Sequence, residues 1–292
     1  MNLNASCISC IVGREEKRIR PLKDEAMKKD YMIRVLHILA EDNGEPAPAK
    51  SIHLKKLQEE MLWAQPSWRE TNRSYNLMML KTEKDLQEKI AAAKDPLAAA
   101  MLYARAGNYI DFGAMQDVSK EKLEELLDRA LSETLDPQTY EDFLQDLKKA
   151  KSLVYLTDNC GEIVADKLLI SQLLHQFPEL QITVVVRGEE AVNDATLIDA
   201  REVGLTELVP VIGNGTAIPG TYLPAVLPEV RDQIKTADLI ISKGQGNFES
   251  LHECGLNIYY LFLCKCELFT RRFGMKQYEG VFIREKNVKI KG

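Results

Sequence analysis

The chain has 292 residues, of which 45% are hydrophobic and 28% charged, and its formal net charge is -6. This length allows one or two domains with a large core, and the composition is that of an ordinary globular protein. The acidic balance argues against a general nucleic-acid binder. No apolar run approaches the roughly 20 residues that span a bilayer, and no signal peptide is visible, so we expect no membrane partner. Six cysteines are too sparse for a secreted disulfide scaffold, so we expect a reducing cytoplasm.

Residues 15–150 are predicted to be helical throughout, because apolar residues recur there at helix-like spacing. In the pairs Asp95-Pro96 and Asp136-Pro137, Asp suits the N-cap and Pro the first helical position. We expect an all-helical N-terminal domain or lid over residues 1–150. The predicted helices span about 24–41, 51–63, 73–93, 95–106, 119–133 and 137–150.

After residue 151 the pattern changes, and short apolar strands alternate with helical segments. Such alternation is typical of an α/β domain with a parallel sheet covered on both faces, here over residues 151–292. The segment 280–288 is predicted to be an edge strand or a hairpin arm. The predicted strands are 152–157, 181–187, 207–212, 237–242 and 257–263, and the predicted helices are 162–176, 191–203, 223–235 and 248–254.

Polar side chains follow several of these strands. Asp158 and Asn159 come after the first strand, Asp194 follows the second, and Lys243 follows the fourth. Because the carboxyl ends of parallel strands meet at one edge, we expect these side chains to converge. Two carboxylates and an amide are hard oxygen ligands, which favour Mg²⁺ or Mn²⁺. We therefore predict a metal site at Asp158, Asn159 and Asp194, with Asp158 and Lys243 as catalytic residues. The alternative for Asp158 is a simple helix cap.

The same edge is predicted to bind phosphate. Lys243 and Arg187 would neutralise negative charge in the transition state, and glycines would let backbone N–H groups approach an anion. Before the sheet, Asn108 and Asp111 lie between Gly107 and Gly113 and could face the same cleft, although a capped helix junction also explains them. The predicted substrate- or phosphate-binding residues are Glu162, Arg187, Asn193, Gly244, Gln245, Gly246, Asn247, Asn108 and Asp111.

Four other α/β site types lack their motifs. No Gly-x-Gly-x-x-Gly turn follows the first strand, so a dinucleotide-binding site is poorly supported. Neither a phosphate-binding loop ending in Gly-Lys-Ser/Thr nor a Gly-x-Ser-x-Gly nucleophile elbow is present. The first strand ends in Asp-Asn and lacks the Asp-x-Asp of aspartyl-phosphate hydrolases, which makes a covalent aspartyl intermediate unfavoured.

Two close cysteine pairs stand far apart in the sequence, Cys7 with Cys10 and Cys264 with Cys266. They would form a second metal site or a redox site only if the ends of the chain met in space. The alternative is that they are small buried residues.

Four segments together resemble the damage-control phosphatase family, once catalogued as a domain of unknown function and also called acidic-residue-methyltransferase-like. The similarity covers nearly the whole chain in the right order, and the early Cys-x-x-Cys is similar to the compact, mainly prokaryotic branch. The four segments are 106–113, the Asp-Asn-Cys-Gly-Glu segment at 157–167, Asn-Asp-Ala-Thr within 192–196, and Ser-Lys-Gly-Gln-Gly-Asn within 241–249.

This resemblance implies a helical part packed on a Rossmann-like sheet, and metal-dependent removal of phosphate from small phosphometabolites such as sugar phosphates or cofactor phosphates. It implies that Asp158, Asn159 and Asp194 hold the metal and that Lys243 contacts phosphate. Mg²⁺ or Mn²⁺ is the expected ion, with Co²⁺ or Ni²⁺ able to substitute. The alternatives are a protein carboxyl methyltransferase, for which no glycine-rich adenosine-binding turn is seen, and a thiol-ligated metal-binding or redox protein.

Overall fold

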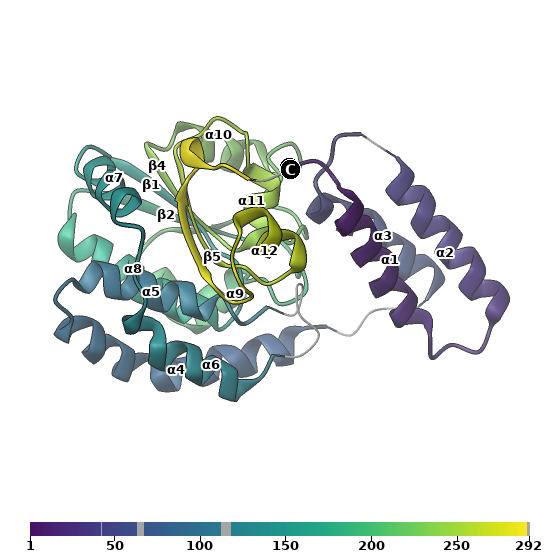
Figure 1. Ribbon diagram of the computed structural model, residues 1–292, viewed down its shortest axis with the longest axis horizontal. Helices are drawn as coiled ribbons and strands as arrows, with labels where there is room; N and C mark the ends of the chain where they lie inside the picture. Colours follow the sequence, from purple (N-terminus) through teal and green to yellow (C-terminus); the bar gives the residue numbers. More distant parts are fainter. Residues whose placement is uncertain (42, 63–66, 112–117, 291–292) are drawn as a thin grey trace.

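A six-stranded sheet in the order β3-β2-β1-β4-β5-β6 forms the centre of the molecule (Figure 1). β1 to β5 are parallel, and β6 pairs antiparallel with β5 at the edge. The computed structural model describes residues 1–41, 43–62, 67–111 and 118–290. The predicted α/β fold is confirmed, including the edge strand. The strands are β1 Ser152–Leu156, β2 Gln181–Val186, β3 Val211–Gly213, β4 Leu239–Lys243, β5 Ile258–Leu263 and β6 Gly280–Arg284.

Helices cover both faces of the sheet because alternate strand residues bury apolar side chains in two separate cores. Tyr155 of β1 belongs to the core beneath α4 to α9, whereas Val154 belongs to the core beneath α10 to α12. No helix of the described residues is long and apolar enough to cross a bilayer. These helices are α4 Arg69–Ala92, α5 Pro96–Gly107, α6 Lys120–Arg129, α7 Pro137–Leu147, α8 Glu162–Gln176, α9 Leu197–Glu202, α10 Pro228–Thr236, α11 Gln245–Leu251 and α12 Glu267–Phe273.

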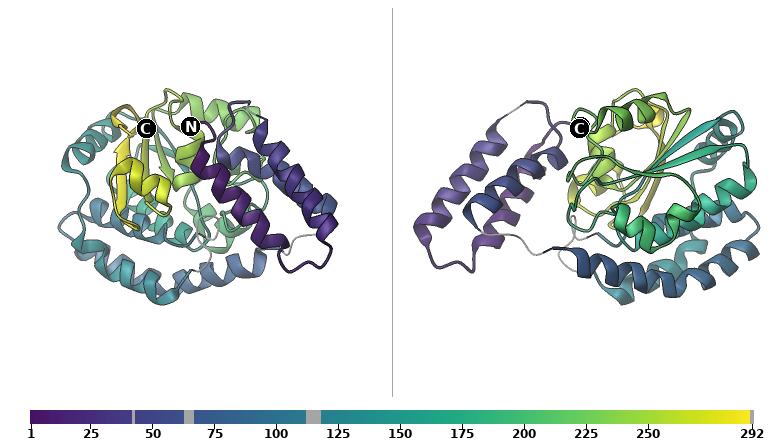
Figure 2. Two further views of the ribbon diagram at one scale, coloured as in Figure 1. Left: turned by 45° about the vertical axis from the view of Figure 1, so that its right-hand side comes forward. Right: turned by 180° about the vertical axis from the view of Figure 1, so that it is seen from behind.

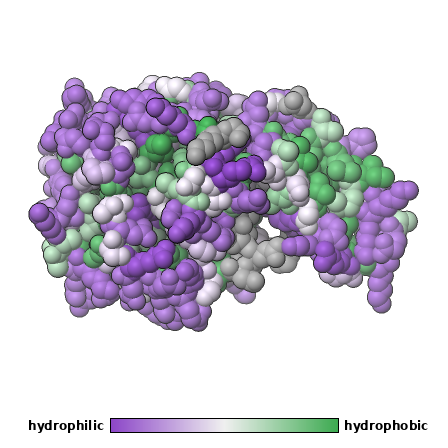
Figure 3. All heavy atoms as spheres, viewed as in Figure 1, coloured by the Kyte–Doolittle hydropathy of each residue, from purple (hydrophilic) through white to green (hydrophobic). Residues whose placement is uncertain are grey.

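The first three helices, α1 Ala5–Ile19, α2 Glu25–Ala40 and α3 Ala47–Met61, form a lobe that projects from the sheet (Figures 1 and 2). This lobe has a small core of its own, and apolar side chains also reach its surface (Figure 3). Helices α4 to α7 instead share their core with the sheet. Packing therefore separates the chain after α3, whereas the domain boundary expected at residue 150 stays a prediction.

Several predicted elements differ from the structure. Helix α1 was not predicted, although Asn4 caps it by accepting a hydrogen bond from the Cys7 N–H. Helix α12 was also missed. Helix α9 is much shorter than the predicted 191–203, because residues 192–196 form a turn before it. The N-caps predicted at Asp95 and Asp136 are confirmed.

Candidate functional site

The strand order places the loops after β1 and β4 next to each other at the carboxyl edge of the sheet. β1 lies between β2 and β4, and the strand order reverses here: β2 and β3 are added on one side of β1, and β4, β5 and β6 on the other. In open α/β sheets, this is where ligands bind. Asp158 and Asn159 follow β1, Lys243 ends β4, and Gly244 comes directly after it.

Backbone hydrogen bonds join the loop after β1 to the loop after β2. The Cys160 N–H donates to the Asn193 carbonyl at 2.8 Å, and the Ala195 N–H donates to the Asp158 carbonyl at 2.8 Å. Asn159 and Asp194 thereby form an isolated antiparallel bridge. The structure thus brings together the three residues that the sequence predicts as metal ligands.

Arg187 lies between the two aspartates. Its Nε is 2.6 Å from Asp194 Oδ2, and its Nη2 is 3.6 Å from Asp158 Oδ1. Its Nη1 donates to the Thr221 hydroxyl at 3.3 Å. Thr221 was not predicted from the sequence. Nη2 is buried and has no hydrogen-bond partner among the described residues. A guanidinium that still has an unpartnered N–H is suited to donate a hydrogen bond to a phosphoryl oxygen.

Glu162, the first residue of α8, is the centre of the hydrogen-bond network. Its carboxylate accepts from the Asn159 backbone N–H at 3.2 Å, from Asn159 Nδ2 at 2.9 Å and from Asn108 Nδ2 at 2.9 Å. Asn159 Nδ2 also donates to Asp158 Oδ2 at 2.7 Å, as does Asn108 Nδ2 at 3.0 Å. Because the Asn159 amide nitrogen faces these carboxylates, its oxygen faces away from them. The predicted role of Glu162 in substrate binding stays a prediction.

Lys243 is fully buried, and its side chain extends towards Glu162 and Asp166 of α8. Its ammonium donates to Glu162 and Asp166 at 2.6 Å each and to the Ala104 carbonyl at 2.9 Å, which uses all three N–H groups. Burial alone would lower the pKa of Lys243, but Asp166 and Glu162 raise the pKa above its ordinary value. This geometry gives Lys243 a supporting position, and its direct contact with phosphate stays a prediction that these hydrogen bonds do not favour.

We expect Lys243→Met to lower the free energy of unfolding by about 3–5 kcal/mol, because it leaves Glu162 and Asp166 buried without their cation. Urea unfolding measures this change. Lys122→Met is the control, since Lys122 pairs with Glu125 at the exposed surface and should cost about 1 kcal/mol or less. Equal losses in the two variants would contradict this assignment.

Lys265, which follows β5, was not predicted. Its Nζ lies 2.6 Å from Asp111 Oδ2, and its positive charge opposes the rise that burial causes in the pKa of Asp158. Lys265 therefore belongs to the same cluster as the β1 loop. The sequence does show a lysine two residues after an apolar strand. Because Lys265 stands between two cysteines, the segment was interpreted as a possible thiol site instead.

The remaining predicted residues mostly hold the surrounding loops together. Asn193 Nδ2 donates to the Ile110 carbonyl at 3.0 Å. Asn247 Nδ2 donates to the carbonyls of Thr157 and Lys243 at 3.0 and 2.7 Å. Gln245, Gly244 and Gly246 begin α11 or precede it, and Gln245 Nε2 donates to Cys266 Sγ at 3.5 Å. Gly113, which the sequence placed beside Asp111, lies outside the described residues.

The turn before Asp194 contains an unusual backbone. Val192 has φ +50°, which is uncommon for a β-branched residue, and the Asp194 N–H donates to the Ala191 carbonyl at 3.0 Å. Such conformations persist where the surrounding structure holds them, and they cluster at functional sites. The sequence pattern predicts a helix here, and this turn instead presents Asp194 to the β1 loop.

The charges at this edge do not balance. The cluster contains five carboxyls and three cations. If all of them were ionised, the cluster would carry an excess of two negative charges. Burial raises the pKa of Asp158 well above its usual range, and the negative charges of Asp194 and Glu162 raise it further. Burial also raises the pKa of Asp194 to about 6, although Arg187 lowers it. The group consists of the carboxyls of Asp111, Asp158, Glu162, Asp166 and Asp194 and the cations Arg187, Lys243 and Lys265.

A divalent cation fits this charge excess, since it would neutralise two negative charges that the described side chains leave uncompensated. The donor set also fits, because Asp158 and Asp194 provide carboxylate oxygens and Asn159 an amide oxygen, the ligand types that Mg²⁺ and Mn²⁺ prefer.

The cysteines give a different result. Cys7, Cys264 and Cys266 contact the same apolar core, so the two ends of the chain do meet. However, no three His, Cys, Asp or Glu side chains of the described residues are placed to hold a metal ion, either at the cysteines or at the strand-end cluster, where the proposed donors are two carboxylates and an amide. Burial raises the pKa of both Cys7 and Cys264 to about 12, which disfavours the thiolates that bind metals. These observations do not favour a thiolate metal centre at Cys7, Cys10, Cys264 and Cys266, and a second metal or redox site there stays a prediction.

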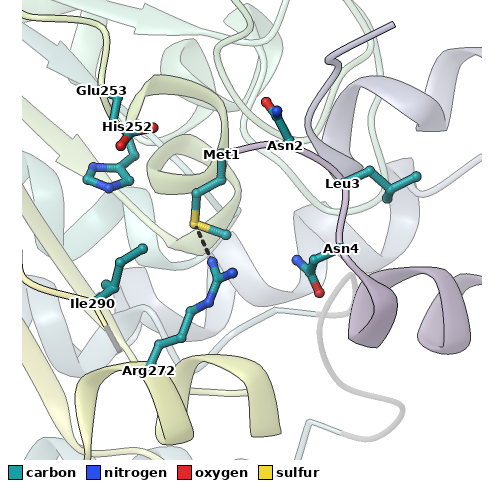
Figure 4. A pocket seen from close by; sticks show the side chains of 8 residues that line it. All are labelled: Met1, Asn2, Leu3, Asn4, His252, Glu253, Arg272 and Ile290. Atoms are coloured by element: carbon teal, nitrogen blue, oxygen red, sulfur yellow. Dashed lines mark hydrogen bonds between the residues drawn. The ribbon is translucent and has the colours of Figure 1, made fainter. Parts of the chain in front are cut away.

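A cavity of about 350 Å³ lies away from the strand-end cluster, between the N-terminal segment and the α11–α12 region (Figure 4). Arg272 points into it and donates to the Met1 sulfur at 3.0 Å. None of the residues predicted for the functional site lines this cavity. Its lining residues are Met1, Asn2, Leu3, Asn4, His252, Glu253, Arg272 and Ile290.

Comparison with known proteins gives consistent matches along the chain. The model of the damage-control phosphatase ARMT1-like domain matches residues 3–281. A protein named damage-control phosphatase from Archaeoglobus fulgidus is 30% identical, over 94% of this chain and 96% of that protein. Another protein of that name, from Pyrococcus horikoshii, is 28% identical, over 98% of this chain and 99% of the relative.

A solved structure agrees with these matches. The crystal structure of a DUF89 family protein from Pyrococcus horikoshii superposes with a TM-score of 0.79 at 27% sequence identity. The superposition covers 98% of this chain and 99% of that chain. The similarity thus includes the α1–α3 lobe as well as the sheet.

Proposed function

The chain belongs to the damage-control phosphatase ARMT1-like family, and we propose that it is a metal-dependent phosphatase that hydrolyses phosphomonoesters of small metabolites. Two relatives of nearly the same length are named damage-control phosphatases, which supports the phosphatase activity. The observation that supports metal dependence is the excess of two negative charges in the buried cluster around Asp158 and Asp194.

Asp158, Asn159 and Asp194 would hold Mg²⁺ or Mn²⁺ through side-chain oxygens. A bound metal supplies polarisation of a phosphoryl oxygen and orientation of a water molecule for attack. Glu162 keeps the Asn159 amide in the orientation that leaves its oxygen facing away from the carboxylates, through two hydrogen bonds from the Asn159 N–H groups. Lys243 forms an ion pair with Glu162 and holds that carboxylate in place.

Arg187 and Lys265 would bind the phosphate. Arg187 has a buried N–H without a partner in the described part of the chain, and Lys265 donates to Asp111 and lies close enough to Asp158 to lower the pKa of that carboxyl. Two cations close to the metal ligands would balance the charge that spreads over the phosphoryl oxygens during transfer. Sugar phosphates and cofactor phosphates are the proposed substrate classes.

We expect hydrolysis of a general phosphatase substrate in the presence of Mg²⁺, Mn²⁺, Co²⁺ or Ni²⁺, and none after treatment with excess chelator. Added metal should restore the activity, because the ligands are present in the folded chain. Mn²⁺ at 100 times its dissociation constant should stabilise the fold by about 2.7 kcal/mol. Full activity in chelator, with no thermal shift by any of the four metals, would refute metal dependence.

A further inference from the structure

Asn76, on helix α4, contacts the turn after β1 and helix α9, which follow Asp158 and Asp194 respectively. Its side chain is fully buried. Its Oδ1 accepts from the Gly161 N–H at 2.7 Å, and its Nδ2 donates to Asp199 Oδ1 at 3.1 Å and to Glu202 Oε2 at 3.0 Å. One amide thus joins the turn after β1 to helix α9, which begins directly after the turn that contains Asp194.

The Gly161 turn needs such support. Gly161 has φ +77° and ψ -54°, close to a classic γ-turn, a rare backbone conformation that favours glycine. Helix α4 and the segment after α5 both pack tightly against it, since a Cβ at Gly161 would lie 3.2 Å from Tyr75 Cβ of α4 and 2.8 Å from Ile110 Cδ1. The hydrogen bond from Asn76 therefore satisfies a buried N–H that water does not reach, in the segment that positions Asp158 and Asn159.

The second contact of Asn76 is with Asp199, which caps helix α9. Asp199 Oδ2 accepts from the Thr196 backbone N–H at 2.9 Å and from the Thr196 hydroxyl at 2.6 Å, which forms the capping box of α9. Thr196 lies two residues after Asp194. Arg69 of α4 also binds Asp199, at 2.8 Å, so α4 neutralises the carboxylate that fixes this loop.

We infer that Asn76 is a positioning residue that sets the distance between the two metal-binding loops, an inference that rests on the proposed metal site. It acts on the ligands through Gly161 and Asp199. Loss of its amide would leave the Gly161 N–H without its acceptor and would remove one of the donors to Asp199. The loops that hold Asp158 and Asp194 would then depend on their mutual backbone hydrogen bonds and on Arg187 alone, and we expect their separation to vary more.

Hydrogen exchange of the metal-free protein tests the geometric part without any activity. In Asn76→Ala we expect exchange in the segments 158–163 and 193–200 to become about tenfold faster, because a buried hydrogen bond to each loop is lost. Met79→Ala is the matched control, since Met79 lies on the same helix and its buried side chain packs in the apolar core. It should destabilise the fold while leaving exchange in the two segments closer to wild type.

Asn76→Asp provides a second variant if the alanine variant does not fold. An aspartate keeps an acceptor for the Gly161 N–H but places a carboxylate against Asp199 and Glu202. Exchange should then rise in 193–200 more than in 158–163. Equal protection in all variants, or equal loss in Asn76→Ala and Met79→Ala at matched stability, would overturn the inference.

Mn²⁺ titration gives the functional readout. We expect the Mn²⁺ dissociation constant to rise about tenfold in Asn76→Ala and to change less than about twofold in Met79→Ala, because only the first change loosens the ligand loops. If wild type binds no Mn²⁺, the proposed metal site fails, whereas the exchange experiment still decides whether Asn76 joins the loops. If wild type binds Mn²⁺ and Asn76→Ala binds it equally well, Asn76 does not position the ligands.

Discussion

Asp158→Asn is expected to reduce phosphatase activity by on the order of 10³-fold or more while leaving the metal-free protein at least as stable as wild type. The loss of activity follows because a metal ion contributes several kcal/mol to the transition state, and each 1.4 kcal/mol is about tenfold in rate. The stability result follows because burial and the carboxylates of Asp194 and Glu162 raise the pKa of Asp158, so its ionised form is unfavourable without metal.

Steady-state kinetics and thermal unfolding in chelator measure the two effects. Asp146→Asn is a suitable control, because Asp146 is hydrogen-bonded to Tyr259 and Asn257 at the opposite end of β5. It should lower stability and leave kcat/KM largely unchanged. Near-wild-type activity in Asp158→Asn would reject Asp158 as a metal ligand, and a large loss of metal-free stability would show that its role is structural.

Gly244→Ala is expected to reduce activity by on the order of 10²-fold, since displacement of a reacting group by about 1 Å has an effect of that size. Gly244 has φ +79°, and a Cβ there would lie 2.7 Å from Asp158 Oδ1 and would overlap Oδ2 and the carboxyl carbon. The Asp158 carboxylate must move, and it moves relative to Asn159 and Asp194.

Gly255→Ala separates the steric effect from the backbone effect. Gly255 has φ +77°, and no atom of the described residues lies within 4 Å of the position that a Cβ would occupy there. Both alanine variants should lose about 1–3 kcal/mol of stability from the positive φ, and Gly244→Ala the more, because Gly244 has ψ 159°, a combination that is essentially restricted to glycine. Only Gly244→Ala should lose activity and Mn²⁺ affinity. Equal kinetic behaviour of the two variants would contradict the close approach of β4 to Asp158.

The parallel sheet and the convergence of Asp158, Asn159 and Asp194 could be predicted from the sequence, because strand ends of a parallel sheet share an edge. The direction of Lys243 could not be predicted. A residue at the end of a strand can face either side of the sheet, and only the positions of Glu162 and Asp166 on α8 show that this ammonium lies beneath the site.

The supporting contacts from α4 were also beyond sequence reasoning. Asn76 lies in a helix with an ordinary apolar face, and its bond to Gly161 joins residues 85 positions apart. The separate α1–α3 lobe was missed because the helical pattern continues from α3 into α4, whereas the division depends on which core each apolar face enters. The assignment to the Cys-x-x-Cys branch of the family stays a prediction.

Anomalous diffraction from crystals soaked in Mn²⁺ tests the central claim most directly. We predict one strong peak per chain at the carboxyl edge of β1, within about 2.3 Å of side-chain oxygens of Asp158, Asn159 and Asp194, as expected for a small hard cation. The peak should vanish in Asp158→Asn. A peak at Cys7 and Cys266 instead, or no peak between Asp158 and Asp194 at saturating Mn²⁺, would contradict the proposed metal site.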